Sequence, residues 1–484
     1  MKIILVSIFV LLTGINMAFS KTYKGEKEII FEAKNGQSSI AFEGSFMVPE
    51  NRNKKDSRMI PINYVRFPAT DKNASVPIVY LSGGPGGSGI QTAKYRRFPL
   101  FMKMREFGDV IALDQRGTGA SDINPRCNSN IVIDQSKIIS DEKHVELHQN
   151  ALKECLVYWE SEGVDVMGYT TNESVKDLVA LRKHFNADKI SLWGISYGSH
   201  LALAAMKSIS DQLDKVIIAS AEGLSQTVKL PARTDAYFDR LQSAINTQEK
   251  SKAMFPDIKA LIKRVHAKVD QQPIELQIPM SDDETYTFML HRRNLQEFSS
   301  GLISDPIRAK MMLHLYLAID YNMLEPIIDV IKKYNRHNTP ISYRAMPIAM
   351  DLASGMGTEK RQMIEEQAKS GLLKDYLNFS YHLTDVLPVI DLGDEFRKKP
   401  KSAVPTLLLT GTLDGRTYIK SQQEAVSGLS HLSAVLINNA GHNLFMKSDS
   451  EIWTEVEQTI VEFMQSKKTV NKTITVPLPD FSEM

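Results

Sequence analysis

Residues 189–209 read KISLWGISYGSHLALAAMKSI. Residues 189–193, with Ile190, Leu192 and Trp193, predict a strand, and the stretch 201–209, rich in Ala and Leu, predicts a helix. Between them stands Gly-Ile-Ser-Tyr-Gly at 194–198, which fits a sharp strand-to-helix turn that lifts the Ser196 hydroxyl above the edge of a sheet. A tight turn without chemistry is the plainer interpretation, but the position between strand and helix favours a nucleophile.

Apolar strands and amphipathic helices alternate on both sides of this turn. Continuous apolar strands that alternate with helices indicate a mostly parallel sheet covered by helices on both faces, which is an α/β fold. The other predicted strands lie at 60–67, 76–82, 110–113, 216–220, 406–410 and 434–437.

The alternation stops near residue 224 and returns only near residue 406. The residues between are charged, rich in Met, and helical in pattern. The simplest organisation is one α/β core made of residues 21–225 and 401–468, interrupted by a helical cap insertion at 226–400 that has the size of a domain of its own. The two prolines of residues 469–484 suggest a loosely held tail.

The first twenty residues have the features of a cleavable signal peptide. Lys2 provides a positive start, residues 3–12 are almost wholly apolar, and Ala-Phe-Ser at 18–20 supplies small residues before the cut. The apolar part falls short of the ~20 residues that span a bilayer, so no stable membrane anchor is expected. The mature chain is therefore predicted to begin near Lys21 and to be secreted or periplasmic.

Export changes the meaning of the two cysteines, Cys127 and Cys155. In an oxidising compartment these two residues are expected to form a disulfide. Two free buried thiols are the alternative, because an isolated pair of cysteines is weak evidence in a sequence.

The composition excludes several classes of protein. The chain has 484 residues, of which 43% are hydrophobic and 24% charged, as in an ordinary folded globular protein. Lys and Arg number 58 against 57 for Asp and Glu, so the net charge is +1. A nucleic-acid partner is not expected, since such proteins carry a basic surplus. Nothing in the sequence predicts an oligomeric state.

A serine nucleophile needs a base, and the base needs a carboxylate to orient it. Asp414 and His442 each follow one of the two returning C-terminal strands, so both are expected at the same carboxyl edge of the sheet as Ser196. They also stand in the chain order Ser, Asp, His that accompanies this turn. The alternative base is His431, before the last strand, and the alternative acid is Asp449, which breaks the order.

A glycine-rich loop, Gly-Gly-Pro-Gly-Gly-Ser-Gly at 83–89, follows the second predicted strand. It lacks the Lys-Ser/Thr of a phosphate-binding loop and does not match the dinucleotide fingerprint. We expect the N–H of Gly83 or Gly84, together with that of Tyr197, to bind an oxyanion. The charged residues of Asp-Gln-Arg-Gly-Thr-Gly at 114–119 are expected to lock a turn.

Four motifs together carry a family resemblance: those at 83–89, 114–119 and 194–198, and Gly-His-Asn at 441–443. The set resembles the α/β-hydrolase serine peptidases of the proline iminopeptidase and tripeptidyl aminopeptidase group. The resemblance covers about residues 45–225 and 400–465 and is absent across the insertion.

This resemblance implies an α/β-hydrolase fold and a peptide substrate. It further implies that Ser196 attacks a scissile carbonyl, that His442 carries the proton, and that Asp414 fixes the imidazole. It implies no metal and no organic cofactor, and it implies that the insertion is a cap over the site.

The leading hypothesis is an exported serine aminopeptidase that releases residues or short peptides from peptide N-termini through an acyl-enzyme on Ser196. A carboxylesterase or lipase-like hydrolase with the same three residues is the alternative, because the motifs do not separate amide from ester cleavage. A non-catalytic binding protein on the same scaffold is the third possibility, and the intact Ser196, Asp414 and His442 count against it.

An exopeptidase must recognise the protonated amine of its substrate, and a nearby carboxylate provides the complementary charge. Glu222 is the candidate, because it directly follows the predicted strand at 216–220 and so lies at the same edge as Ser196. A loop glutamate in a salt bridge or in water is the plainer interpretation.

Overall fold

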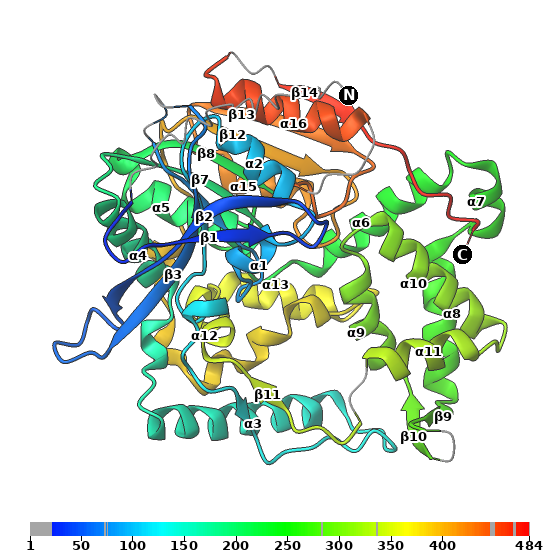
Figure 1. Cartoon of the computed structure of the whole chain (residues 1–484). Coiled ribbons are helices and arrows are strands. Elements are labelled where there is room, and N and C mark those ends of the chain that lie inside the picture. The colour runs from blue at the N-terminus through cyan, green and yellow to red at the C-terminus, as the bar shows by residue number, and fades with distance from the viewer. Residues whose placement is uncertain are drawn as a thin grey trace, which may run out of the picture.

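The computed structural model describes residues 22–71, 74, 76–281, 284–334, 337–445, 451–467 and 471–483. The predicted signal peptide and the alternative acid Asp449 lie outside these residues. Figure 1 shows a central sheet with helices on both faces and a group of helices on the right. Within the described part of the chain, no helix is both long enough and apolar enough to cross a membrane.

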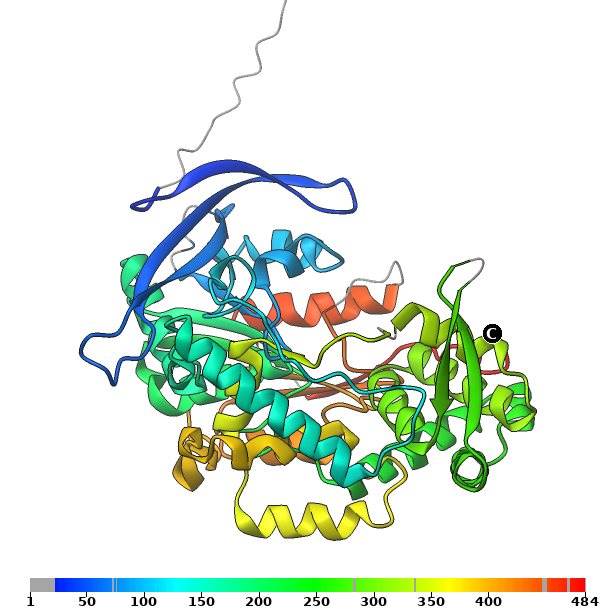
Figure 2. The same ribbon diagram turned by 90° about the horizontal axis from the view of Figure 1, so that it is seen from below.

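The central sheet has ten strands in the order β1-β2-β3-β5-β4-β7-β8-β12-β13-β14. The strands from β5 to β14 pair in parallel, whereas β1, β2 and β3 are antiparallel and curve along one edge (Figure 2). The bounds are β1 Lys27–Glu32, β2 Ser38–Pro49, β3 Met59–Phe67, β4 Ile78–Leu81, β5 Val110–Leu113, β7 Ile190–Ile195, β8 Leu213–Ala219, β12 Thr406–Gly411, β13 Leu432–Asn438 and β14 Lys472–Thr475.

The central parallel strands are buried on both faces. All residues of β4, β5, β7 and β12 are buried, which explains why they appear in the sequence as unbroken apolar runs. One face packs against α4 (Thr171–His184), α5 (Tyr197–Ser208) and α15 (Ile419–Val426). The other packs against α1 (Gly89–Ala93), α2 (Phe98–Met104) and α16 (Glu451–Met464).

Each predicted strand coincides with an observed one to within a few residues, so the prediction of an α/β fold is confirmed. Strands β1, β2 and β14 of this sheet were not predicted. The first two are largely exposed and show no regular alternation of polar and apolar residues, and β14 is a four-residue edge strand.

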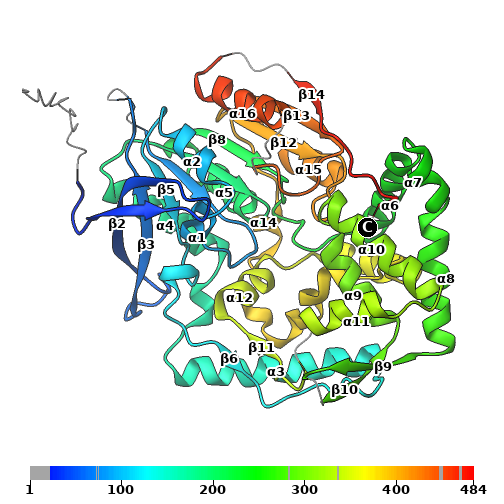
Figure 3. The same ribbon diagram turned by 45° about the vertical axis from the view of Figure 1, so that its right-hand side comes forward.

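Between β8 and β12 the chain is mostly helical. Helices α6 to α11 surround an apolar cluster of their own, whereas α12 packs its Met346 and Met350 into the cluster beneath the sheet (Figure 3). The bounds are α6 Pro231–Ile245, α7 Glu249–Met254, α8 Ile258–Gln271, α9 Arg292–Leu302, α10 Pro306–Asp320, α11 Glu325–Tyr334, α12 Ala345–Ser354, α13 Thr358–Ala368, η4 Tyr376–Val386, η5 Pro388–Ile390 and α14 Gly393–Arg397.

This helical segment also contains a hairpin that the sequence analysis did not predict. Its strands are β9 (Ile274–Pro279) and β10 (Thr285–Leu290), which pair with each other and not with the main sheet. The hairpin lies beside the segment that leads into α3 (Asp141–Ser161), where the Met289 N–H donates to the Gln135 carbonyl over 2.9 Å.

The prediction of a loosely held tail is wrong. Residues Lys472–Thr475 form β14, which pairs in parallel with β13, and Ile474 packs into the core beside α16. Farther on, the Phe481 side chain is fully buried in the cluster formed by α6 to α11. Burial of the apolar Ile474 and Phe481 holds this segment against the rest of the molecule, even though it contains two prolines.

The predicted disulfide between Cys127 and Cys155 is present. Cys127 lies in the two-residue strand β6 (Cys127–Asn128), which pairs with β11 (Ser342–Tyr343), and Cys155 lies in α3. Both cysteines are buried in the main core cluster. The bridge therefore joins α3 to a segment that also contacts the helical region.

We expect the double variant Cys127→Ala/Cys155→Ala to lose roughly 3–4 kcal/mol of unfolding free energy, because the bridge spans 28 residues and restricts the unfolded chain. Urea unfolding of both proteins without reductant measures the difference. With reductant the two proteins should unfold at nearly the same urea concentration. Equal stability in the absence of reductant would contradict a structural role for the bridge.

Candidate active site

Ser196 stands on the sharp turn between β7 and α5. Its backbone angles, φ 54° and ψ −126°, lie in a region that non-glycine residues rarely adopt. The turn requires glycine at both flanking positions. A Cβ on Gly198 would lie 2.0 Å from the Leu81 carbonyl oxygen, and a Cβ on Gly194 would lie 2.5 Å from the Gly198 oxygen. This is the geometry of a nucleophile elbow.

Asp414 and His442 are brought into direct contact. The Nδ1 of His442 lies 2.9 Å from Oδ2 of Asp414, a buried carboxylate that also accepts from Thr417 Oγ1 (2.6 Å) and from the backbone N–H groups of Arg416 (2.7 Å) and Thr417 (2.9 Å). With Asp414 accepting at Nδ1, the imidazole keeps Nε2 available as a base.

The charge of Asp414 is held by its partners. Burial raises the pKa of this carboxyl, but the His442 imidazole and the hydrogen bonds from Thr417 outweigh it and hold the pKa below its usual range. An ionised carboxylate at Nδ1 fixes the ring orientation and stabilises a protonated imidazole.

The loop that carries His442 is held from two sides. The Ser220 hydroxyl, at the end of β8, donates to the His442 carbonyl over 2.7 Å. The His442 N–H donates to the Ser304 carbonyl, between α9 and α10, over 2.8 Å. Neither serine was predicted, because no motif marks either one and Ser304 belongs to the helical segment.

Ser196, His442, Gly83 and Gly84 line one cavity of about 870 Å³. A Cβ on Gly83 would lie 3.7 Å from the Ser196 hydroxyl oxygen, so the glycine loop passes directly beside the serine. Tyr197 is the first residue of α5, and N–H groups of a first helical turn have no intrahelical acceptor. Ser196, His442, Gly83 and Gly84 thus meet at one cavity, with Tyr197 next to Ser196 in the chain and Asp414 bonded to the imidazole.

The glycine loop is anchored by Asp114. Its carboxylate accepts from Ser88 Oγ (2.6 Å), Ile90 N (3.1 Å) and Ala120 N (2.7 Å), and so ties the start of α1 to the turn after β5. Asp114 and Arg116, the charged residues of the motif at 114–119, do not form an ion pair with each other. Each makes hydrogen bonds to other parts of the chain.

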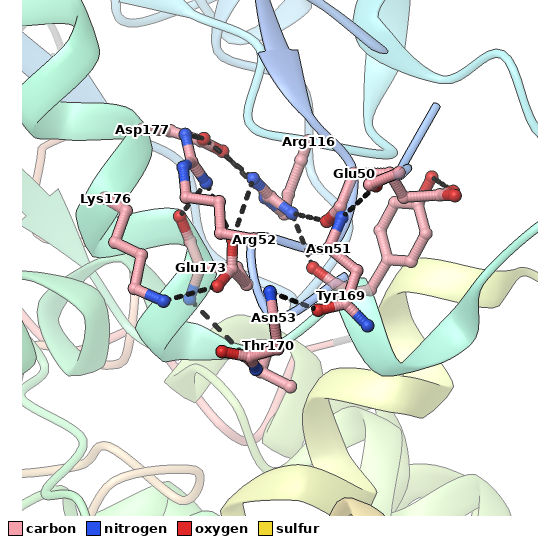
Figure 4. Close-up of polar contacts among 12 residues, drawn as sticks. Glu50, Asn51, Arg52, Asn53, Arg116, Tyr169, Thr170, Glu173, Lys176 and Asp177 are labelled. Atoms are coloured by element: carbon pink, nitrogen blue, oxygen red, sulfur yellow. Dashed lines mark hydrogen bonds and ion pairs between the residues drawn. The ribbon is translucent and has the colours of Figure 1, made fainter. Parts of the chain in front are cut away.

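Arg116 is fully buried and forms the centre of a polar network (Figure 4). Its guanidinium donates from Nε and Nη2 to both oxygens of Asp177 on α4, each over 2.7 Å. It also donates from Nη1 to the carbonyls of Glu50 (2.6 Å) and Gly168 (2.5 Å). Arg52 approaches Asp177 from the other side over 2.7 Å. The motif therefore supports the sheet edge and takes no part in the cavity.

The alternative base His431 is exposed and directly precedes β13, at the amino end of that strand. His442 follows the carboxyl end of the same strand. The two histidines thus lie at opposite ends of β13, and only His442 lines the cavity with Ser196.

Glu222 is buried at the expected edge, but it already has a partner. Its Oε2 lies 2.7 Å from Lys229 Nζ, and its N–H donates to Ser199 Oγ over 2.9 Å. Burial raises the pKa of Glu222, and the Lys229 ammonium overcomes this and holds it below its usual range. Glu222 lines a second cavity of about 260 Å³, and Arg416 lines both cavities.

Asp351, on α12, is a neighbour that the sequence analysis missed. Burial, together with the neighbouring Glu222 carboxylate, raises the pKa of Asp351 to about 7. Asp351 and Glu222 are therefore two neighbouring acids of different strength. Among the described residues, no group of three or more His, Cys, Asp or Glu side chains is placed to hold a metal ion.

The fold can now be assigned. Residues 76–252 match the family model described as alpha/beta hydrolase fold, and this region contains β4, β5, β7, β8 and the elbow. Together with the mostly parallel sheet, this match shows that the chain has the α/β-hydrolase fold.

The relatives of this chain are distant and match it only in part. Serine protease Hip1 of Mycobacterium tuberculosis is 29% identical over 192 residues, which cover 37% of this chain and 35% of that protein. A probable proline iminopeptidase of Leptolyngbya boryana is 31% identical over 136 residues, or 28% of each chain. Among solved structures, Rv0554 from Mycobacterium tuberculosis is 14% identical, with a TM-score of 0.40 over 88% of this chain and 99% of that one.

The chain is thus distantly related to a serine protease and to a probable proline iminopeptidase, and it matches about a third of the length of Hip1.

The close contact at Gly198 predicts a measurable cost. Gly198→Ala should lower the unfolding free energy by roughly 2–3 kcal/mol, because the added methyl meets the Leu81 carbonyl. Gly301→Ala on α9 is the matched control, since no atom lies within 4 Å of its added Cβ, and it should be neutral or stabilising by about 0.5–1 kcal/mol. Chemical unfolding measures both, and equal stabilities would contradict the elbow geometry.

Proposed function

We propose that the protein is an exported serine aminopeptidase that releases residues or short peptides from peptide N-termini. The observation that carries the proposal is the meeting of Ser196, the glycine loop and the Asp414–His442 pair around one cavity. The names of the relatives, a serine protease and a probable proline iminopeptidase, support peptides over other substrates. The disulfide and the predicted signal peptide support export.

The proposed reaction has two halves. The Ser196 oxygen bonds to the scissile carbonyl carbon while its proton passes to Nε2 of His442, and the carbonyl oxygen accepts from Tyr197 N–H and from Gly83 or Gly84 N–H. His442 then gives the proton to the leaving amine as the C–N bond breaks. In the second half, water attacks the acyl ester, its proton passes to His442, and Ser196 recovers that proton as it leaves.

We also propose that the segment 226–400 acts as a cap that limits the substrate. The turn between α9 and α10 bonds the His442 loop through Ser304, and residues Asp305, Ile307 and Arg308 border the cavity. About 870 Å³ is in the range of small-molecule sites, which suits a few residues of a peptide better than a long chain.

The amine of the substrate is proposed to bind at the Glu222 side. Ser199 connects this residue to the nucleophile, because its hydroxyl donates to the Ser196 carbonyl (2.5 Å) and accepts from the Glu222 N–H. A substrate ammonium would compete there with Lys229, and Asp351 provides a second acid nearby.

Ser196→Ala should lower kcat by roughly 10⁴-fold or more, because the three residues act as a unit, while the protein stays folded. Ser208→Ala, at the exposed far end of α5, is the matched control and should keep full activity. Aminoacyl and tripeptidyl anilides, tested beside short acyl esters, measure the turnover. A fluorophosphonate probe should label the parent protein and spare Ser196→Ala.

If the protein hydrolyses the esters but not the anilides, the esterase alternative replaces the peptidase proposal. An unlabelled, inactive parent protein would favour a binding protein.

Glu222→Gln should raise KM at least tenfold for peptides with a free N-terminus and far less for N-acylated peptides or esters, because only the former present an ammonium. Glu359→Gln is the matched control, since Glu359 is exposed at the rim of the same cavity. Steady-state kinetics on paired free and acetylated peptides measure the effect. Equal losses on both kinds of peptide would show that Glu222 acts only through its salt bridge with Lys229.

A further inference from the structure

The cavity that holds Ser196 is strongly cationic. Four arginines line it: Arg96 and Arg97 between α1 and α2, Arg308 in the first turn of α10, and Arg416 in the loop after β12. Among the residues that the structure describes, Asp305 is the one carboxylate that lines the cavity. Three segments far apart in the sequence thus deliver four guanidinium groups to one space.

These charges are not neutralised by their described neighbours. Within the part of the chain that the structure describes, none of the four arginines forms an ion pair with a carboxylate. Arg97 donates to the Tyr80 hydroxyl, and Arg416 donates from Nη1 to the Ser300 carbonyl over 3.0 Å. Arg96 and Arg308 are exposed at the mouth. Each guanidinium retains donors that suit a carboxylate.

Asp305 does not offset this surplus. It is the N-cap of α10, and its Oδ1 accepts from the Ile307 N–H over 3.1 Å. The carboxylate is thus engaged with the helix end, where it offsets the positive pole of the helix. The arginines outnumber it in any case.

Arg97 and Arg308 lie near the loop that carries His442. Nη2 of Arg97 lies 3.4 Å from Oδ1 of Asn443, the residue after His442. Arg308 lies in the first turn of α10, the helix that follows Ser304, and the Ser304 carbonyl accepts from the His442 N–H. In acyl transfer to serine, the imidazole protonates the leaving group, so the leaving group occupies this side of the cavity.

We propose that the substrate carries a carboxylate in its leaving half, and that Arg96, Arg97, Arg308 and Arg416 select for it. This inference rests on the proposed acyl transfer at Ser196. The carboxylate comes either from the free C-terminus of a short peptide or from an Asp or Glu side chain just after the scissile bond. Guanidinium groups bind both in the same way, through paired N–H donors.

The proposal gives the substrate a fixed direction. Its ammonium end binds at the Glu222 side, and its carboxylate end binds the arginines of the cavity that holds Ser196. Charge complementarity at both ends sets the register of a short peptide and disfavours the reversed orientation.

Three peptides with the same N-terminal residue test the preference. The leaving half is Gln-Ala-amide in the first, Gln-Ala with a free C-terminus in the second, and Glu-Ala-amide in the third. We expect kcat/KM of the second or the third peptide to exceed that of the first by at least tenfold. Preference for the second alone identifies the C-terminal carboxylate, and preference for the third alone identifies the side chain.

Arg96→Glu and Arg308→Glu, both at exposed positions, should each reduce the anionic-to-neutral ratio of kcat/KM by at least tenfold. Lys310→Glu is the matched control, because it makes the same charge change on α10 at a residue that does not line the cavity, and it should leave the ratio unchanged. Raised salt should lower the ratio of the parent protein.

Equal hydrolysis of all three peptides would overturn the inference, as would arginine variants that slow all three peptides alike. If no peptide is cleaved but acyl esters are, the peptidase proposal fails. A pair of phenyl esters, with and without a carboxylate on the leaving phenol, then tests the arginines separately: a tenfold preference for the charged ester upholds their role, and no preference refutes it.

Discussion

The close approach of Gly198 to the end of β4 is the constraint on which the site depends. Only a hydrogen atom fits between the Gly198 Cα and the Leu81 carbonyl, so β7 can turn sharply into α5 directly beside β4. This places Ser196 at the carboxyl edge and brings the loop that leaves β4, which begins with Ser82 and Gly83, against it. Asp414 and His442 reach the same edge because β12 and β13 run parallel to β7.

A buried network behind the glycine loop completes this arrangement. Burial of the Arg116 charge costs desolvation free energy. A bidentate hydrogen-bonded ion pair with Asp177 and hydrogen bonds to two backbone carbonyls offset this cost. Because Asp177 lies on α4, the network fixes the turn after β5 against a helix. The carboxylate of Asp114, two residues earlier, accepts hydrogen bonds from Ser88 and Ile90 at the start of α1. The glycine loop is therefore held at its far end by side chains that never contact the cavity.

The central strands and the three proposed catalytic residues were predictable because their signals are local. A strand buried on both faces must be apolar throughout, and Ser196 and Asp414 follow two such strands. His442 follows the partly buried parallel strand β13, so a topological rule brings the three residues to one edge of the sheet. The half-exposed β1 and β2 and the hairpin β9–β10 carry weaker patterns. Ser304, Arg308 and Asp351 come from the helical segment, where the position of each residue depends on packing between helices and no motif marks it.

The segment after β14 connects the two halves of the molecule mechanically. It leaves the sheet edge beside β13 and inserts Phe481 among the helices α6 to α11, where the Phe481 carbonyl also lies 2.9 Å from His314 Nε2 (Figure 1). If these helices moved away from the sheet, either the Phe481 ring would leave its apolar cluster or the pairing between β14 and β13 would break. Burial of such a ring is worth roughly 2–3 kcal/mol, so the segment resists separation of the helices α6 to α11 from the sheet.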